Sequence, residues 1–182
     1  MSDQIAPKSV LFVCTANQCR SPMAEVLLKS LVARRGEADR WQIQSAGTWT
    51  EPGRPATQLA QVVMHRRAID LSGHRSRVID ADLLAAASVI LVMTRHHHEA
   101  VRAEFPEVQH KVYLLSQLID RSFDIEDPYG GNLDDYELCA TDLQNILTDG
   151  YDRLVELVDR AVPAHHQAGM QRVGGLSGKV PE

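Results

Sequence analysis

One short segment near the N-terminus constrains this chain more than any other. Residues 10–13 read Val-Leu-Phe-Val, and Cys14, five further residues and Arg20 follow directly. Four consecutive apolar residues predict a buried parallel strand. Ser21 is a good helix N-cap, and Pro22 suits the first helical position because its missing N–H would have no partner there. Cys14 is therefore expected at the carboxyl end of a strand, just before a helix, where open α/β sheets bind ligands.

The loop between Cys14 and Arg20 has the chemistry of an anion site. Amide N–H groups ahead of a helix lack helical partners, and the helix dipole adds positive potential there. The planar guanidinium of Arg20 matches two oxygens of a phosphate group. The same field favours the thiolate form of Cys14, and a thiolate held beneath a phosphate is a nucleophile. The alternative is that Cys14 is an inert buried thiol at the end of a strand.

Strand and helix patterns alternate along the chain, which predicts an α/β protein with a parallel sheet covered by helices on both faces. Residues 116–132 read mostly as a loop with several acidic side chains. Within the second predicted helix, Leu59, Val62 and Val63 are expected to face inward. Strands are predicted at 10–13, 41–45, 88–93 and 111–115, and helices at 22–35, 56–67, 80–87, 95–104 and 134–161.

The length of 182 residues suits one domain with a substantial core. We expect an N-terminal extension over residues 1–8, a domain over 9–162 and a disordered tail over 163–182, where apolar residues are few. The formal net charge of −5 argues against general binding of nucleic acid. No apolar run is long enough to cross a membrane, and residues 1–8 lack the apolar stretch of a signal peptide, so we expect a cytoplasmic protein.

Several motifs occur in an order that resembles one known family. The run Cys14-x5-Arg20-Ser21-Pro22, with Asn17 inside the loop, is similar to the signature of the low-molecular-weight protein tyrosine phosphatases. Motifs in the family's order are more specific than any single one. The further matches are Ser-Ala-Gly-Thr at 45–48, the segments 70–77 and 89–94, and Asp-Pro-Tyr at 127–129.

This resemblance covers roughly residues 9–160. It implies a three-layer α/β/α fold with a four-stranded parallel sheet of order 2-1-3-4, and a phosphatase that uses no metal or other cofactor. Its substrate would be a phosphorylated protein and its product inorganic phosphate. Cys14 would attack phosphorus and form a cysteinyl-phosphate, while Arg20 would hold the phosphate oxygens. The phosphate-binding loop would comprise Thr15, Ala16, Asn17, Gln18, Cys19 and Ser21.

Asp127 is the predicted general acid. A phosphate ester needs its leaving oxygen protonated as the bond to phosphorus breaks, and an acid on a separate loop suits that task. Pro128 stiffens the backbone beside Asp127, and Tyr129 is placed to flank a substrate. In isolation the Asp-Pro pair would more often be an ordinary turn, so this assignment depends on the match to the family's acid loop.

A supporting hydrogen-bond network is also implied by the resemblance. It would join Asn17, Ser21, Ser45 and His74, with His74 giving structural support rather than carrying a proton. Asn17 tolerates a positive φ angle better than most residues, so it suits a sharply bent loop. The alternative for His74 is an ordinary surface or core histidine.

The other cysteines and histidines have plainer interpretations. Cys19 shares the loop with Cys14, and in the resembling family such a pair closes a reversible disulfide; a small buried packing residue is an equal alternative. Cys139 lies within a helical pattern and is expected in the core. The run His-His-His at 96–98 suggests a metal, but consecutive helical residues point about 100° apart and cannot all bind one ion. We therefore predict no metal site.

Two loop residues depart from the family pattern. Ala16 stands where the family often has Gly, which would cost about 1 kcal/mol if a positive φ angle were needed there. Gln18 stands where tyrosine phosphatases of the family usually have an aliphatic residue and phosphoarginine phosphatases have Thr. Trp49 and Tyr129 are predicted aromatic walls of the substrate pocket, which favours phosphotyrosine, although packing or surface roles remain alternatives.

Phosphotyrosine hydrolysis is therefore the leading functional hypothesis, and hydrolysis of protein phosphoarginine at the same loop is the first alternative. Thioredoxin-coupled arsenate reduction would need resolving cysteines in the middle of the chain, and none lies between Cys19 and Cys139. A non-catalytic phosphoprotein-binding module would be expected to lack the nucleophile or the acid, yet Cys14, Arg20 and Asp127 are all present.

Overall fold

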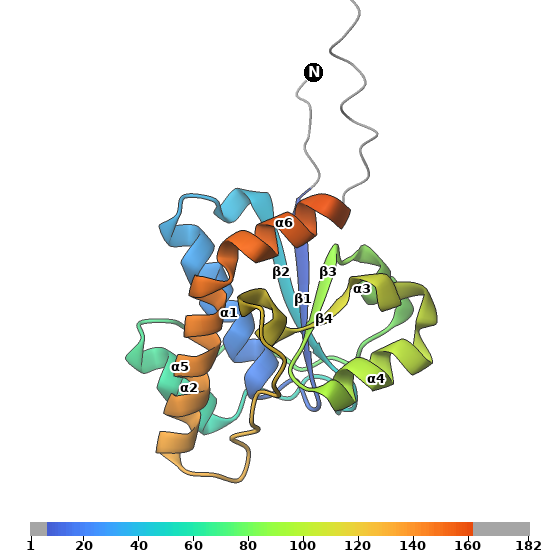
Figure 1. The fold of residues 1–182 in the computed structure, drawn as a ribbon. Coiled ribbons are helices and arrows are strands. Elements are labelled where there is room, and N and C mark those ends of the chain that lie inside the picture. The colour runs from blue at the N-terminus through green and yellow to red at the C-terminus, as the bar shows by residue number, and fades with distance from the viewer. Residues whose placement is uncertain (1–6, 162–182) are drawn as a thin grey trace, which may run out of the picture.

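A four-stranded parallel sheet organises the computed structural model, which describes residues 7–161 (Figure 1). The strand order is β2-β1-β3-β4, so the predicted order 2-1-3-4 is confirmed. Most of the predicted N-terminal extension and all of the predicted tail over 163–182 lie outside the described residues, and the domain boundaries stay predictions. The strands are β1 (Lys8–Cys14), β2 (Trp41–Gly47), β3 (Val89–Val92) and β4 (Val112–Leu114).

Alternate residues of the central strand β1 enter two different apolar clusters. Val10 and Phe12 pack on one face of the sheet, and Leu11 and Val13 pack on the other. A strand projects successive side chains to opposite faces, so a strand that is apolar throughout must be covered on both sides. The sheet is therefore the middle layer of three.

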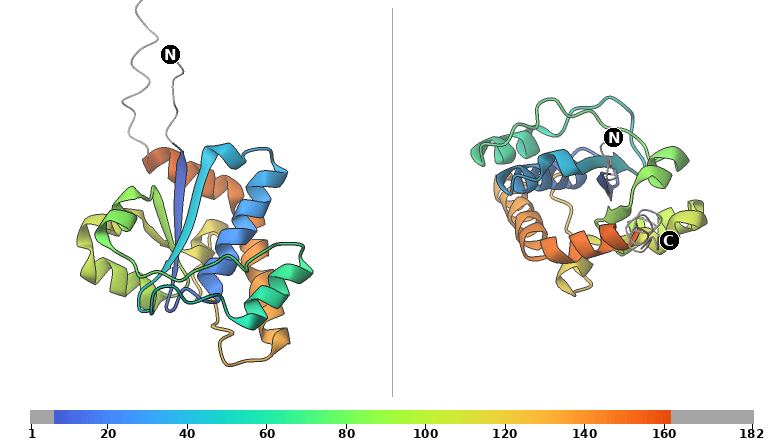
Figure 2. Two further views of the ribbon diagram at one scale, coloured as in Figure 1. Left: turned by 180° about the vertical axis from the view of Figure 1, so that it is seen from behind. Right: turned by 90° about the horizontal axis from the view of Figure 1, so that it is seen from above.

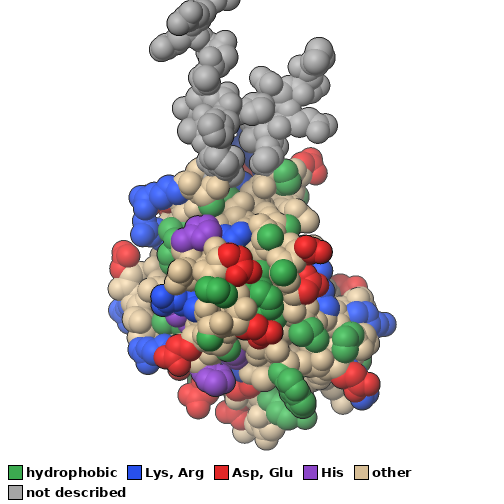
Figure 3. All heavy atoms as spheres, turned by 90° about the vertical axis from the view of Figure 1, so that its right-hand side faces the viewer, with side chains coloured by type: hydrophobic (Ala, Val, Ile, Leu, Met, Phe, Trp, Pro, Cys, Tyr) green, Lys and Arg blue, Asp and Glu red, His purple; other side chains and the backbone are tan. Residues whose placement is uncertain are grey.

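Helices cover both faces, as Figures 1 and 2 show. One face packs against α1 (Arg20–Arg34), α2 (Gln58–Arg66), α5 (Leu133–Asp149) and α6 (Tyr151–Ala161), and the other against α3 (Ala81–Ala86) and α4 (Arg95–Glu104). On the side that carries α3 and α4, acidic and basic side chains are interspersed (Figure 3). Among the described residues, no helix combines the length and apolar character needed to span a bilayer. Short 3-10 helices occupy Ala38–Arg40 (η1), Pro106–Lys111 (η2) and Leu115–Ile119 (η3).

The prediction of one continuous helix over 134–161 was wrong. The chain forms two helices, α5 and α6, which meet at Gly150 and run in different directions (Figure 1). A Cβ at Gly150 would lie 2.5 Å from the Cβ of Leu118 in η3, so only glycine allows this close approach. The change of direction lets α6 pack across one end of the sheet (Figure 1). The apolar periodicity of the sequence continues through Gly150 and therefore does not reveal this change of direction.

Two smaller predictions also need correction. Ser21 is not the N-cap of the first helix: α1 begins at Arg20, its N-cap is Cys19, and no side chain caps it. The hydroxyl of Ser21 instead bonds within the loop, so it does not bind the helix amides. In α2 the inward face is formed by Ala60, Val63 and Met64, whereas Val62 is 37% exposed because it lies to the side of that face.

Candidate active site

The Cys14 side chain lies at the carboxyl end of β1, buried beneath the loop that leads to α1. Its register partner on β2 is Gly47, and the sequence of β1 places the thiol on the face that packs against α1. The Sγ atom of Cys14 is 3.0 Å from the Oγ atom of Ser21. This hydroxyl is therefore placed to donate to sulfur, which stabilises a thiolate more than a thiol.

Several carbonyl groups of residues 14–18 are turned toward the surrounding protein. The carbonyl oxygens of Cys14 and Thr15 accept from the backbone N–H groups of Thr48 and Trp49, at 2.9 and 3.0 Å. The oxygen of Gln18 accepts from Thr57 at 2.9 Å. Within residues 7–161, by contrast, the backbone N–H groups of 15–19 donate to no protein acceptor. Such a run of unpaired donors is typical of an anion-binding nest.

Asn17 holds the bend of this loop. Its φ angle is +54°, in the left-handed region that Asn adopts more readily than most residues. Its side chain is buried and its Nδ2 atom donates to the Oγ atoms of Ser21 and Ser45, at 2.9 Å each. Its Oδ1 atom accepts from the backbone N–H of Arg77 at 3.0 Å. The Asn17 side chain therefore makes hydrogen bonds to three different segments of the chain, which contain Ser21, Ser45 and Arg77.

The structure brings the four residues of the predicted network together. His74 donates its Nε2–H to the backbone oxygen of Asn17 at 2.6 Å, and burial lowers the pKa of His74, so a neutral ring suits this position. Ser45 accepts from Asn17 and donates to a carboxylate oxygen of Glu25 at 2.5 Å. Because Asn17 already donates to Ser21, the Ser21 hydroxyl proton has two acceptors within reach, the Sγ atom of Cys14 at 3.0 Å and the backbone oxygen of Ala46 at the longer distance of 3.4 Å. No role was predicted for Glu25, which lies outside the matched motifs, or for Arg77, which lies at the end of the matched segment 70–77.

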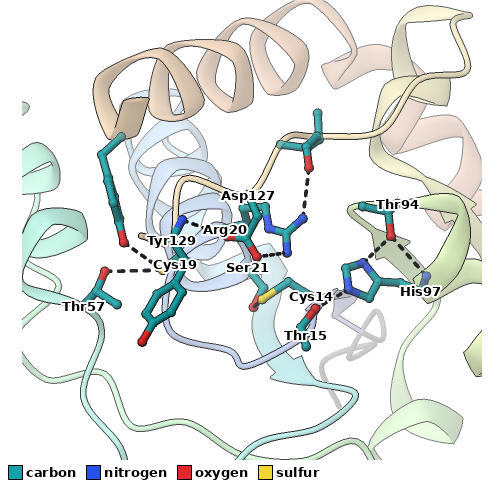
Figure 4. Close-up of polar contacts among 12 residues, drawn as sticks. Cys14, Thr15, Cys19, Arg20, Ser21, Thr57, Thr94, His97, Asp127 and Tyr129 are labelled. Carbon is teal, nitrogen blue, oxygen red and sulfur yellow. Dashed lines mark hydrogen bonds and ion pairs between the residues drawn. The ribbon is translucent and has the colours of Figure 1, made fainter. Parts of the chain in front are cut away.

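Arg20 and Asp127 meet above Cys14, although they are more than 100 residues apart in the sequence (Figure 4). The Nη2 atom of Arg20 donates to Oδ2 of Asp127 at 2.6 Å, and Nη1 donates to the backbone oxygen of Ile125 at 3.0 Å. The Nε–H of Arg20 is buried and has no protein partner within the described chain. A buried charged donor without a partner is costly, so this atom also points to an anionic ligand.

A pocket of about 350 Å³ opens over these groups. Trp49 and Tyr129 stand at its rim with exposed fractions of 80% and 72%, so they are available to a ligand rather than packed in the core. Ala16 is not among the described non-glycine residues with a positive φ angle, so its methyl group carries no backbone strain there. The lining residues are Cys14, Thr15, Ala16, Gln18, Cys19, Arg20, Trp49, Asp127 and Tyr129.

The remaining thiols are poor nucleophiles. All three cysteines are free and buried. Burial raises the pKa of Cys19, whose Sγ atom lies 3.4 Å from both the Thr57 and the Tyr136 hydroxyl oxygens. Burial also raises the pKa of Cys139 to about 12. Within the described chain, no three His, Cys, Asp or Glu side chains are grouped closely enough to hold a metal ion.

His97 is another member of the site that the sequence did not predict. It lies in the first turn of α4 and is fully enclosed, with its ring between Thr94 and the loop residue Thr15. The neighbouring histidines gave a misleading signal, because the run at 96–98 suggested a metal rather than a hydrogen bond. One feature of the sequence could have indicated the role of His97. Thr94 and His97 follow the carboxyl end of β3, which lies next to the end of β1 where the loop begins.

Comparison with known proteins agrees with this geometry. A protein-arginine-phosphatase of Bacillus subtilis (strain 168) is 34% identical over 139 residues, which cover 76% of this chain and 91% of that protein. A low molecular weight phosphotyrosine protein phosphatase of Rattus norvegicus is 35% identical over 140 residues, which cover 74% and 88%.

Solved structures give the same result. The YwlE arginine phosphatase from Geobacillus stearothermophilus superimposes with a TM-score of 0.75 at 30% identity, over 84% of this chain and 97% of that one. The tyrosine phosphatase AmsI of Erwinia amylovora gives a TM-score of 0.73 at 29% identity, over 84% and 97%. A sequence profile for the low molecular weight phosphotyrosine protein phosphatases matches residues 9–161. This match extends over almost all of the described residues, and the chain therefore belongs to the low molecular weight phosphotyrosine protein phosphatase family.

Proposed function

We propose that this protein is a cysteine-dependent phosphatase that hydrolyses phosphotyrosine-type phosphomonoesters in phosphorylated proteins. The observation that carries the proposal is that one pocket contains a thiol, a buried guanidinium and a carboxyl group, contributed by Cys14, Arg20 and Asp127. These are the groups that a metal-independent displacement at phosphorus needs: a nucleophile, a charge clamp and an acid. The three free cysteines suit a reducing compartment, and we assign the activity to the cytoplasm.

Substrate binding would use the donors that the protein leaves unpaired. The backbone N–H groups of residues 15–19 and the Nε–H of Arg20 would donate to the phosphate oxygens. A bound dianion would also compete with Asp127 for the Nη2 donor of Arg20. That exchange would release the Asp127 carboxyl group from its ion pair and leave it facing the leaving oxygen.

The first chemical step would transfer the phosphoryl group to sulfur. The Cys14 thiolate attacks phosphorus in line, so a sulfur–phosphorus bond forms while the bond from phosphorus to the phenolic oxygen breaks. Protonated Asp127 gives its proton to that oxygen, and the tyrosine leaves as a neutral phenol. Ser21, 3.0 Å from the sulfur, stabilises the thiolate before attack.

The second step would hydrolyse the cysteinyl-phosphate. Asp127, now a carboxylate, accepts a proton from a water molecule as the water oxygen attacks phosphorus. The sulfur–phosphorus bond breaks, inorganic phosphate leaves and the Cys14 thiolate is regenerated. Both steps use the same carboxyl group in opposite protonation states, which explains why one acid on a separate loop is sufficient.

The walls of the pocket support an aromatic substrate. Exposed Trp49 and Tyr129 lie on its rim and would stack against the ring of phosphotyrosine. A second candidate substrate is protein phosphoarginine, because Gln18 places a polar amide in the lining where an aliphatic side chain would better match a phenyl ring. The relative in Bacillus subtilis that carries the name protein-arginine-phosphatase supports testing this candidate.

Kinetics on matched peptides would separate these possibilities. We expect kcat/KM to be higher for a phosphotyrosine peptide than for the same peptide with phosphoarginine or phosphoserine. Replacing Gln18 by Leu should raise the ratio of kcat/KM for phosphotyrosine to kcat/KM for phosphoarginine by about tenfold. Gln18→Thr should lower the same ratio. Cys14→Ser should abolish turnover of every substrate. Full activity of the Cys14→Ser variant would refute the proposed function, and a higher kcat/KM for phosphoarginine would reassign the substrate.

A further inference from the structure

His97 connects Thr15, the first residue of the phosphate-binding loop, to the start of α4. Its Nε2 atom is 2.8 Å from Oγ1 of Thr15, and its Nδ1 atom is 2.9 Å from Oγ1 of Thr94 (Figure 4). The ring is only 2% exposed, although it lies beside an open pocket. A buried histidine whose two ring nitrogens both make hydrogen bonds is held in one orientation. Its ring can therefore fix the position of a side chain on one element relative to another element.

The hydrogen bonds around Thr94 determine which nitrogen carries the proton. The Oγ1 atom of Thr94 caps α4 by accepting from the backbone N–H of His97 at 3.2 Å. Its own hydroxyl proton has no other acceptor among the described residues, so it goes to Nδ1 of His97. The remaining ring proton is then on Nε2 and is donated to Thr15. This arrangement leaves the Thr15 hydroxyl proton free to point into the pocket.

Thr15 depends on this contact for the position of its side chain. Its backbone is fixed from the β2 side, where its carbonyl oxygen accepts from Trp49 at 3.0 Å. Its side chain is exposed and lines the pocket, and His97 is its hydrogen-bond partner within the described chain. Without that partner, the hydroxyl would be free to turn toward solvent. The loop residue next to the nucleophile is therefore positioned by a helix that carries none of the predicted site residues.

The charges around His97 favour its neutral form. Burial lowers the pKa of His97 from its ordinary value of 6.5 to about 4, and the positive charge of Arg20 acts in the same direction. The neighbouring His96 also lowers it, whereas Asp127 and Asp124 act weakly in the opposite direction. A neutral ring has one donor and one acceptor, which is the pairing that Thr15 and Thr94 require.

We propose that His97 is a positioning residue for the phosphatase reaction, which orients the Thr15 hydroxyl so that it donates to a phosphate oxygen in the loop. This inference rests on the proposed function, because it assigns a role to Thr15 in binding the same phosphate group. His97 touches neither the substrate nor Cys14 in this proposal. It acts through Thr15, and this makes the two residues energetically coupled.

Replacing His97 by amide side chains of different length tests its coupling to Thr15. The amide of Gln reaches the position of Nε2, whereas the amide of Asn reaches only that of Nδ1. We expect His97→Asn to lower kcat/KM for p-nitrophenyl phosphate about tenfold, equivalent to about 1.4 kcal/mol, and His97→Gln to restore most of it. Thr15→Val should cause a similar loss, and adding His97→Asn to it should cause no further loss. The exposed neighbour offers a control, because His96→Asn should leave activity unchanged.

Several outcomes would overturn the proposal. One is a Thr15→Val enzyme with unchanged turnover. Another is a double variant in which the two single losses of kcat/KM multiply, and a third is a His97→Gln variant that is as impaired as His97→Asn. Because Thr15 is exposed, its variant remains informative even if His97→Asn folds poorly. Calorimetric binding of inorganic phosphate to the same variants provides a readout without turnover. If the wild type hydrolysed no ester but its phosphate affinity showed the non-additive pattern, the proposed function would fail and the role of His97 would stand.

Discussion

Gly47 is the position where one added methyl group should damage the active site most. It pairs with Cys14 across β1 and β2, and a Cβ there would lie 2.5 Å from the carbonyl oxygen of Thr15 and 3.1 Å from the backbone nitrogen of Asn17. Ordinary contact begins near 3.4 Å, so the loop must move by about 0.9 Å relative to the strand. Both close atoms belong to backbone, so neither can rotate away.

The displacement gives the expected size of the effect. Overpacking a rigid site costs about 1–3 kcal/mol of unfolding free energy, and the bond from Trp49 to Thr15 would weaken as well. A misplacement of about 1 Å in a catalytic site lowers the rate by about 100-fold. We therefore expect Gly47→Ala to lower kcat/KM for p-nitrophenyl phosphate by about that factor and to lower stability by about 2 kcal/mol.

Urea unfolding and steady-state kinetics would measure both effects on one preparation. Gly73 provides a matched control, because a Cβ there meets no atom within 4 Å and its φ angle is not in the left-handed region. Gly73→Ala should change stability by less than about 0.5 kcal/mol and leave turnover as in the wild type. A Gly47→Ala enzyme with wild-type turnover and stability would show that the loop is not held against β2 as described.

Two further predictions concern titratable groups. Asp127→Asn should lower kcat/KM for phenyl phosphate by about 100-fold but lower kcat/KM for p-nitrophenyl phosphate less, because nitrophenolate leaves without a proton and kcat/KM does not depend on the later hydrolysis of the cysteinyl-phosphate; equal losses of kcat/KM on both esters would exclude Asp127 as the acid. His97 has a folded pKa of about 4, below its unfolded value, so the unfolded chain binds more protons between pH 6.5 and 4. Stability should therefore fall through this window as pH decreases, and urea titrations should show a smaller fall for His97→Gln; identical profiles would contradict a buried neutral ring.

The strands and most helices were predictable because their signals are local. The apolar run ending at Val13 must be buried on both faces, and alternation of strand and helix patterns leads to a parallel sheet. The break at Gly150 was not predictable, because it depends on the close approach of Leu118 from another element. The predicted N-cap role of Ser21 was wrong for a similar reason, because its hydroxyl bonds to Cys14 and Asn17 instead, and the contact with Asn17 was expected from the family resemblance.

The residues of the site also fall into those that the sequence predicts and those that it does not. The positions of Cys14 and Arg20 follow from one contiguous motif, and the position of Asp127 follows from a match to a family pattern. Among the residues that hold the loop from elsewhere in the chain, Ser45 and His74 were expected from the same family pattern, whereas Glu25 and His97 were not. His97 is the clearest case, because the run 96–98 was considered only as a metal site and rejected as one, whereas the partners of His97 are Thr15 and Thr94.

The central claim is that Cys14 carries the phosphoryl group during turnover. The Asp127→Asn variant offers the most direct test, since with p-nitrophenyl phosphate it should still form the cysteinyl-phosphate but hydrolyse it slowly. The measurement is mass spectrometry of peptides from enzyme quenched in acid during turnover. We predict a phosphoryl group on the peptide that contains Cys14, and no phosphoryl group on the corresponding peptide of the Cys14→Ala, Asp127→Asn double variant. Turnover with no phosphoryl group on that peptide would contradict the mechanism.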